Sequence, residues 1–201
     1  STAAVRINAA ASYIDMGSST WTVTGGWTNN TTSASWNAGT SLVTFDSATG
    51  ATLTFAGANL AENEFNALTF DSTAGTTQTF TMSTRALQIG GTLTVQDSGA
   101  GTEDTILSTS ASNLAVTAGG ITIGADGQLT MNVSTITVNG SWNSASGTMI
   151  RGTSTLVFGA TGTLTTDGSI VDFQLYNVTI NASVTLAFAS AIWIEHNLTL
   201  G

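Results

Sequence analysis

Few residues in this chain have the side chains needed for acid–base or nucleophilic chemistry. His196 is the single histidine and follows Glu195 in the segment IWIEHNLTL. A Ser–His–Asp arrangement would also need an activated serine, yet no serine stands in a Gly-x-Ser-x-Gly context. Cysteine is absent, and one histidine cannot make a histidine-rich metal site. We therefore expect His196 to be a turn or surface residue and predict no catalytic, cofactor-binding or metal-binding residues.

One group of carboxylates could bind a hard cation. Asp97, Glu103 and Asp104 surround a Gly-rich SGAG segment, where oxygen ligands could hold Ca²⁺. Their spacing follows no known calcium loop, so we do not predict a metal site here.

A second group, Glu62, Glu64 and Asp71, could form a glycosidase-like pair. Polysaccharide-cleaving β-helices display several carboxylates together with Arg or Lys on one outer face. Arg6 and Arg85 and Arg151 are instead scattered along the chain. A polysaccharide-active enzyme is therefore a minor alternative, and we predict a protein that is not an enzyme.

Aromatic and asparagine residues offer candidates for carbohydrate contacts. Trp36 is the aromatic side chain that we single out as a candidate for binding a glycan or another surface. Seven Asn-x-Ser/Thr sequons are candidate glycosylation sites, although asparagines at the corners of a repeat would explain them equally well. The sequon residues are Asn29, Asn30, Asn132, Asn139, Asn177, Asn181 and Asn197.

Thr-x-Thr rows raise a further alternative, an ice-binding protein. They begin at Thr20, Thr52, Thr79, Thr92, Thr135 and Thr163. An ice-binding plane needs such rows on one face of successive coils, and their uneven spacing argues against it.

The composition excludes two classes of partner. Charged residues make up 7% of the chain, against a usual share of about 25%. Three cationic and twelve acidic side chains give a net charge of −9, with no lysine at all. Nucleic acids and anionic membranes need clustered Lys or Arg. Because the chain lacks such clusters, we do not expect it to bind nucleic acid. We do not expect membrane insertion either, because no apolar run approaches the roughly 18 residues of a spanning helix.

The elements that carry these residues are predicted to be short β-strands. Apolar residues alternate with threonine in ATLTF (51–55), TLTV (92–95), TITV (135–138) and NVTI (177–180). Two sets of apolar residues recur every 25 residues, Val43 with Leu68 and Leu93, and Phe45 with Phe70 and Val95. A parallel β-solenoid keeps such a register from coil to coil. An antiparallel β-sandwich, which is the alternative all-β fold, has no reason to keep it.

A near-repetition links the two halves of the chain, and we call it the sequence echo. STWTVTGGW (19–27) returns as STITVNGSW (134–142), and GGTLTV (90–95) returns as HNLTLG (196–201). Trp27 thus corresponds to Trp142, and Leu93 to Leu198. The echo predicts one continuous solenoid with module 1 at residues 19–133 and module 2 at 134–201. Module 2 is either a shortened final copy or part of a longer array.

A resemblance accompanies the echo. GGWTNNTTSASWNAGTSLVTFDS (25–47) and its weaker copy GSWNSASGTMIRGTSTLVFGA (140–160) resemble repeats of large secreted surface proteins of bacteria and archaea. FNALTF (65–70) and LYNVTI (175–180) resemble the second part of those repeats. The resemblance implies a β-solenoid stalk, an adhesin or a sheath component.

Together these patterns predict an extracellular, cell-surface structural protein: a stalk or the subunit of a self-assembling filament. Residues 1–18 are expected to cap the first coil or to pair with a neighbouring subunit, and head-to-tail pairing of that kind builds open filaments. The alternative is a surface adhesin that binds a glycan or a host surface.

Overall fold

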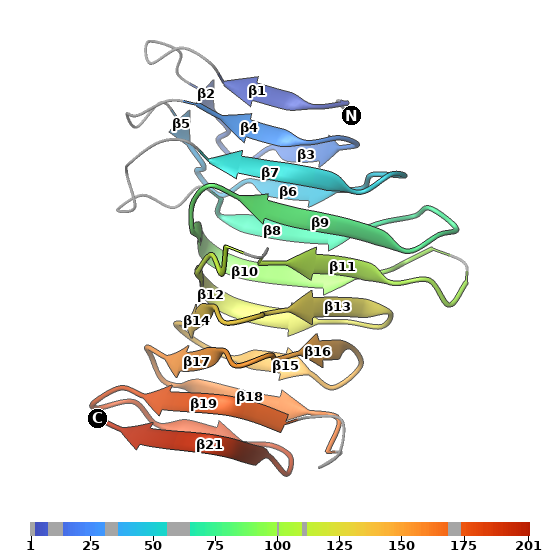
Figure 1. Cartoon of the computed structure of the whole chain (residues 1–201). Helices are drawn as coiled ribbons and strands as arrows, with labels where there is room; N and C mark the ends of the chain where they lie inside the picture. The colour runs from blue at the N-terminus through green and yellow to red at the C-terminus, as the bar shows by residue number, and fades with distance from the viewer. Residues whose placement is uncertain are drawn as a thin grey trace.

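The computed structural model describes residues 3–7, 14–30, 36–55, 65–99, 101–109, 112–168 and 174–201, with the backbone alone at Trp36 and Phe55. These residues form 21 strands and contain no helix. Every strand pairing among them is parallel. The fold is a β-solenoid of about eight coils, with the two termini at opposite ends of the stack (Figure 1). The predicted solenoid is confirmed, and the antiparallel sandwich is excluded.

The strands form three stacks, which we name faces in the order that the chain visits them. Face 1 is the seven-stranded sheet of β1 (Val5–Ile7), β4 (Trp27–Asn29), β7 (Ala51–Phe55), β9 (Gln78–Ser83), β11 (Thr105–Ser108), β13 (Gly127–Thr130) and β16 (Thr148–Ile150). Face 2 contains the first halves of β10 (Leu87–Gln96) and β12 (Val116–Ile123), followed by β14 (Thr135–Val138), β17 (Thr155–Phe158), β19 (Gln174–Ile180) and β21 (Trp193–Leu200).

Face 3 contains β3 (Thr20–Val23), β6 (Leu42–Phe45), β8 (Ala67–Asp71), the second halves of β10 and β12, β15 (Trp142–Ser144), β18 (Gly162–Thr166) and β20 (Leu186–Phe188). A separate pair consists of β2 (Ile14–Asp15) and β5 (Trp36–Asn37). In the sequence, each of these two strands follows a strand of face 1 and precedes a strand of face 3. Within residues 1–18, β1 therefore pairs with β4, and β2 pairs with β5.

Two long strands join faces 2 and 3, because β10 and β12 continue from one face into the next. Glycines occupy the crossing, and the register between the two strands shifts between Ile89 and Thr92. A side chain at Gly91 would meet the carbonyl oxygen of Asn66 at 2.7 Å, and one at Gly119 would meet that of Gly90 at 2.5 Å. Only glycine lets the backbones of adjacent coils approach this closely.

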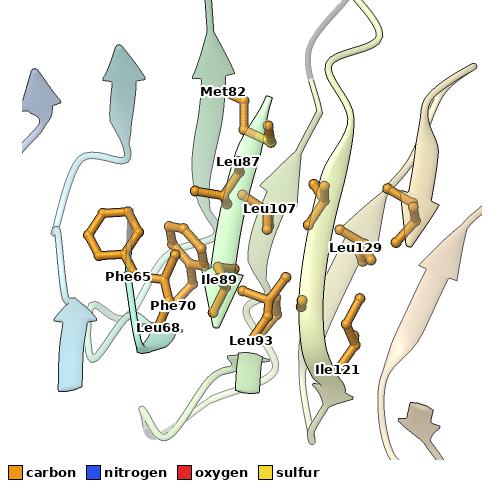
Figure 2. Packing of buried hydrophobic residues seen from close by; sticks show 14 of the residues in the cluster. Phe65, Leu68, Phe70, Met82, Leu87, Ile89, Leu93, Leu107, Ile121 and Leu129 are labelled. Atoms are coloured by element: carbon orange, nitrogen blue, oxygen red, sulfur yellow. The ribbon is translucent and has the colours of Figure 1, made fainter. Parts of the chain in front are cut away.

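The core is a set of columns that run along the solenoid axis. Val43, Leu68 and Leu93 are direct partners, as are Phe45, Phe70 and Val95, so both predicted stacks are confirmed. The rings of Phe45 and Phe70 stack with centroids 5.3 Å apart. Figure 2 shows Leu68, Phe70, Leu93 and Ile121 in the interior between the strands.

Coils of unequal length keep one register. The inner column of face 3 consists of Trp21, Val43, Leu68, Leu93, Ile121, Trp142, Leu164 and Phe188. Its members lie between 21 residues apart, from Ile121 to Trp142, and 28 residues apart, from Leu93 to Ile121. The differences fall in the corner loops, where extra residues do not disturb the paired strands.

Register also decides how the sequence echo maps onto the fold. Trp27 lies on β4 in face 1, whereas Trp142 lies on β15 in face 3. Leu93 lies in face 3, whereas Leu198 lies on β21 in face 2. Each residue of the second copy therefore sits one face earlier than its equivalent in the first. The echo repeats a series of strands and turns, and it does not correspond to a whole number of coils.

A repeated turn introduces several of these strands. Ser41 donates its N–H to the carbonyl of Ala38, and Ser154 donates to that of Arg151. The second turn residues, Gly39 and Gly152, both have φ of 55°. Asn132 occupies the same turn position before β14, with φ of 52°. Asparagine tolerates this left-handed conformation better than most residues, which explains why it replaces glycine here.

Candidate functional site

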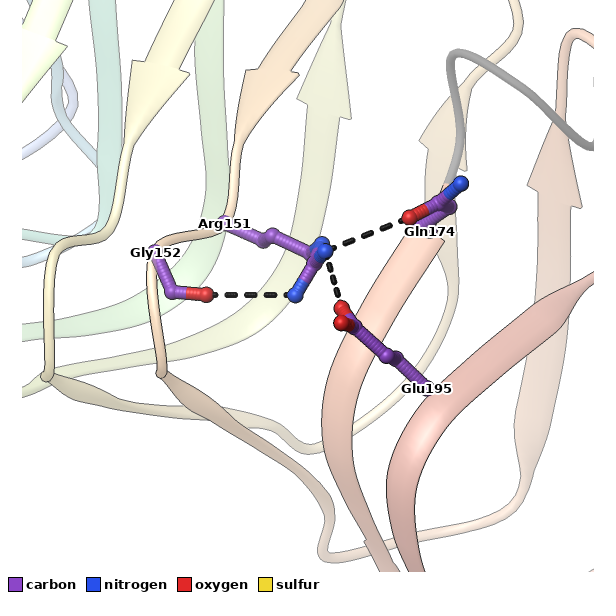
Figure 3. Close-up of polar contacts among 4 residues, drawn as sticks. All are labelled: Arg151, Gly152, Gln174 and Glu195. Carbon is purple, nitrogen blue, oxygen red and sulfur yellow. Dashed lines mark hydrogen bonds and ion pairs between the residues drawn. The ribbon is translucent and has the colours of Figure 1, made fainter.

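The three final coils bring ionic, aromatic and amide side chains together on their outer surface. Arg151 follows β16, Gln174 begins β19, and Glu195 lies on β21. Arg151 Nη2 donates to Gln174 Oε1 at 3.2 Å and forms an ion pair with Glu195 Oε2, while Nη1 donates to the Gly152 carbonyl at 3.3 Å (Figure 3). One guanidinium thus connects three successive coils.

A bulge in β21 positions the aromatic members of the site. The register between β19 and β21 shifts after the Leu175–Ile194 pair, so that Tyr176 faces two residues, Glu195 and His196. The rings of Tyr176 and His196 stack with centroids 4.8 Å apart and an interplanar angle of 5°. Arg151 Cζ lies 5.7 Å from the centroid of the Tyr176 ring, within the range of a cation–π contact.

Amide side chains extend the site along face 2. Asn197 Nδ2 donates to Asn177 Oδ1 at 3.1 Å, and His196 Nδ1 lies 3.0 Å from the same oxygen. Asn177 Nδ2 in turn donates to Thr155 Oγ1 at 3.5 Å. Adjacent coils are therefore connected by hydrogen bonds between side chains as well as by the backbone.

Trp193 stands at the edge of this cluster. It is the direct strand partner of Gln174 and is 52% exposed. The neighbouring Ile194 packs against the core, so Trp193 and Glu195 belong to the outward-facing positions of β21. We define Arg151, Gln174, Tyr176, Trp193, Glu195 and His196 as the candidate site. Its geometry suits planar stacking and multiple hydrogen bonds, and three coils fix its members in place.

The sequon asparagines have different surroundings. Asn29 is 7% exposed on β4, and Asn132 donates to Thr109 Oγ1 at 3.2 Å from its left-handed turn position. Asn177 and Asn197 form the amide contacts described above. Exposed positions after strand ends are occupied by Asn30, Asn139 and Asn181.

Trp36, the aromatic candidate from the sequence, pairs with Ile14 through its backbone. Its side chain lies outside the described part of the molecule, and so do Glu62 and Glu64.

Two of the candidate carboxylates, Asp71 and Asp97, connect neighbouring strands and loops. Asp71 Oδ2 accepts from Gln96 Nε2 at 2.8 Å, and its Oδ1 accepts the Ser98 N–H at 2.8 Å. Asp97 accepts hydrogen bonds from the Gly99 N–H and the Thr105 hydroxyl. Among the residues that the structure describes, no three His, Cys, Asp or Glu side chains are grouped to hold a metal ion.

No motif in the sequence groups Arg151, Gln174 and Tyr176 with His196. Arg151 and Gln174 lie 23 residues apart, which is one coil, and Gln174 precedes Trp193 by a similar interval. A spacing of about one coil is the signal in the sequence that these residues could be neighbours. It identifies neighbours only after each residue has been assigned to a face. His196 lies exposed on a strand.

No protein-family model, curated protein or solved structure matches this chain. In the described residues, no helix has the length and apolar character needed to span a membrane.

Proposed function

We propose that this chain is an extracellular structural protein, either a rigid β-solenoid stalk or the subunit of a self-assembling surface filament. The observation that carries the proposal is the continuity of the fold. One hydrophobic cluster extends from Val5 to Val178 through successive coils, and parallel pairing accompanies it from β1 to β21. Such an array is extended in one direction, as a spacer or filament requires.

The outer surface supports the same role. Thr22, Thr44, Thr69, Thr94 and Thr122 are successive strand partners on the outer side of face 3. Threonine columns favour the extended conformation and add no charge. A surface of this kind suits a passive scaffold, and the resemblance to repeats of secreted surface proteins agrees with an extracellular location.

Self-association is proposed to use the terminal strands. β1 has β4 as its one described partner, and β21 has β19. Leu198 and Leu200 continue the column of Val178 and Ile180, yet they are 52% and 69% exposed. Stacking the first coil of another copy on β21 would cover these side chains and pair with the edge of β21 that faces away from β19.

Sedimentation and electron microscopy near neutral pH test the filament form. We expect ligand-independent polymers with an axial repeat near 4.8 Å, the strand spacing. Leu200→Asp should leave the monomer folded but abolish the polymers, because it places a charge in the proposed junction. Val133→Asp is the matched control, since Val133 is 60% exposed in a corner loop. Monomers alone would contradict the filament form. Recovery of the native protein from cytoplasm would contradict the extracellular role.

A further inference from the structure

The surface around Trp193 differs from the outer side of face 3. The outer positions of face 3 carry mainly threonine, and charged residues make up 7% of the whole chain. The candidate site nevertheless combines an exposed indole with a guanidinium, a carboxylate and a primary amide. Trp, Tyr and Arg are the residue types that contribute most to protein–protein interfaces, and exposed aromatic rings also pack on the apolar faces of ligands. Trp193 is 52% exposed, so much of its indole is in contact with solvent and does not fill the core.

We infer that Trp193, Gln174, Arg151 and Glu195 form a binding surface for a neutral saccharide. One face of a pyranose ring presents C–H groups, which pack well on an exposed indole. Its rim carries hydroxyls that donate and accept hydrogen bonds. Gln174 is the direct neighbour of Trp193, and Glu195 lies two residues along the same strand. Alternate residues of a strand project to the same side about 6–7 Å apart, which is close to the width of a sugar ring.

The charge balance favours neutral over acidic sugars. The guanidinium of Arg151 is paired with the Glu195 carboxylate and also donates to Gln174. The pair offers both donors and acceptors to hydroxyl groups, but it has no net positive charge. The chain as a whole carries −9. A uronic or sialic acid would therefore be repelled at long range and would find no unpaired cation at the site.

The site is also held in place before any ligand arrives. Arg151 connects three coils, and the Tyr176–His196 stack fixes the bulge that carries Glu195. This preorganisation lowers the entropic cost of binding, because few side chains need to be ordered when the ligand binds.

A protein partner fits the surface less well. A stable protein interface buries roughly 800 Å² on each side. The other strongly exposed apolar residues of β21, Leu198 and Leu200, continue the inner column and so do not enlarge the patch around Trp193. One indole surrounded by hydrogen-bonding groups matches a sugar ring in size.

Depletion binding to insoluble polysaccharides tests the inference. The probes are cellulose, chitin and starch as neutral polymers, with alginate and polygalacturonate as acidic ones. We expect the wild-type chain to bind at least one neutral probe and neither acidic probe. Trp193→Ala should weaken that binding about tenfold or more. Trp36→Ala and Val133→Ala are the matched controls and should bind as the wild type does. Circular dichroism would verify that each variant is folded.

Glu195→Gln supplies a readout that a purely structural role would not change. The variant keeps the shape of the side chain but leaves the Arg151 charge unpaired. At moderate ionic strength, where the long-range repulsion by the net charge is screened, the variant should therefore retain more polygalacturonate than the wild type does. Three results would overturn the inference: no retention on any neutral probe, wild-type binding by Trp193→Ala, or loss of binding in Trp36→Ala alone. Retention of a purified protein partner through Trp193 without saccharide binding would likewise overturn it. The inference stands apart from the structural role, because Trp193→Ala should polymerise normally.

Discussion

Leu93 and Leu198 occupy corresponding positions in the two copies of the sequence echo, but their surroundings are opposite. Leu93 lies between Leu68 and Ile121 and is fully buried. Leu198 has Val178 on one side and is 52% exposed. The same local sequence therefore gives the same strand in both places, while the number of neighbouring coils decides how much the side chain contributes to stability.

The two tryptophans of the echo add a second difference. Trp27 packs edge-on against Phe65, with centroids 5.1 Å apart, in the aromatic cluster of the early coils. Trp142 stacks between Ile121 and Leu164 and donates Nε1–H to Ser144 Oγ at 2.9 Å. Both are fully buried. The two tryptophans of the echo thus belong to different columns of the core, Trp27 to face 1 and Trp142 to face 3. This is possible because a strand of either face can place a buried side chain in the core.

The largest expected effect comes from an interior ring with coils on both sides. Phe70 lies between Phe45 and Val95 in its column. Its ring centroid is 5.3 Å from that of Phe45 and 5.1 Å from that of Phe80 on face 1. Phe70→Ala should lower the free energy of unfolding by about 3–5 kcal/mol, because it removes this packing and leaves a cavity. Urea unfolding followed by circular dichroism measures the change. Phe188→Ala is the control, since Phe188 is 50% exposed, and an equal loss in both variants would contradict the account.

The next effect tests the pair of leucines directly. Leu93→Ala should cost about 2–5 kcal/mol, whereas Leu198→Ala should cost less than about 1 kcal/mol because half of its side chain already meets solvent. Parallel urea titrations of the two variants give the comparison. Similar losses of unfolding free energy in the two variants would mean that Leu93 and Leu198 are buried to a similar extent, which would contradict the structure.

A smaller effect is expected at the repeated turns, which are alike in both copies. Gly39→Ala and Gly152→Ala should each destabilise the protein by about 1–3 kcal/mol, since φ of 55° is strained for alanine. A Cβ at either site would also contact a backbone carbonyl of the adjacent coil, that of Gly17 or Asn132. Asn132→Gly should change stability by less than about 1 kcal/mol, because the position already favours glycine. Thermal unfolding that failed to separate these variants would argue against the shared turn.

The parallel fold could be predicted because its signals are local or periodic. Alternation in segments such as TLTV (92–95) predicts strands, and the equal spacing of Val43, Leu68 and Leu93 predicts stacking. Both are confirmed. The displacement of the echo by one face could not be predicted, because it depends on the summed lengths of corner loops. The sequence does not state at which corner each extra residue is accommodated.

The candidate site lay beyond sequence reasoning for the same reason. Arg151, Gln174 and Glu195 come from three coils, and no motif joins them. Their meeting depends on the register of β19 and β21 and on a bulge of one residue. An exposed Trp193 was equally hidden, because strand alternation assigns it to the outer side only once Ile194 is known to pack inward.

Disulfide mapping is the most direct test of the central claim, that successive coils stack in parallel with the echo displaced by one face. The chain has no native cysteine. Thr122 and Asn143 are direct partners on the outer side of face 3, and neighbouring strands about 4.8 Å apart suit a disulfide. Thr122→Cys with Asn143→Cys should form an intramolecular disulfide under mild oxidation. Thr130→Cys with Asn143→Cys should not, because Thr130 lies on face 1. A disulfide in the second pair and not in the first would place Asn143, and with it Trp142, on face 1, which is the face of Trp27. That result would contradict the displacement of the echo by one face.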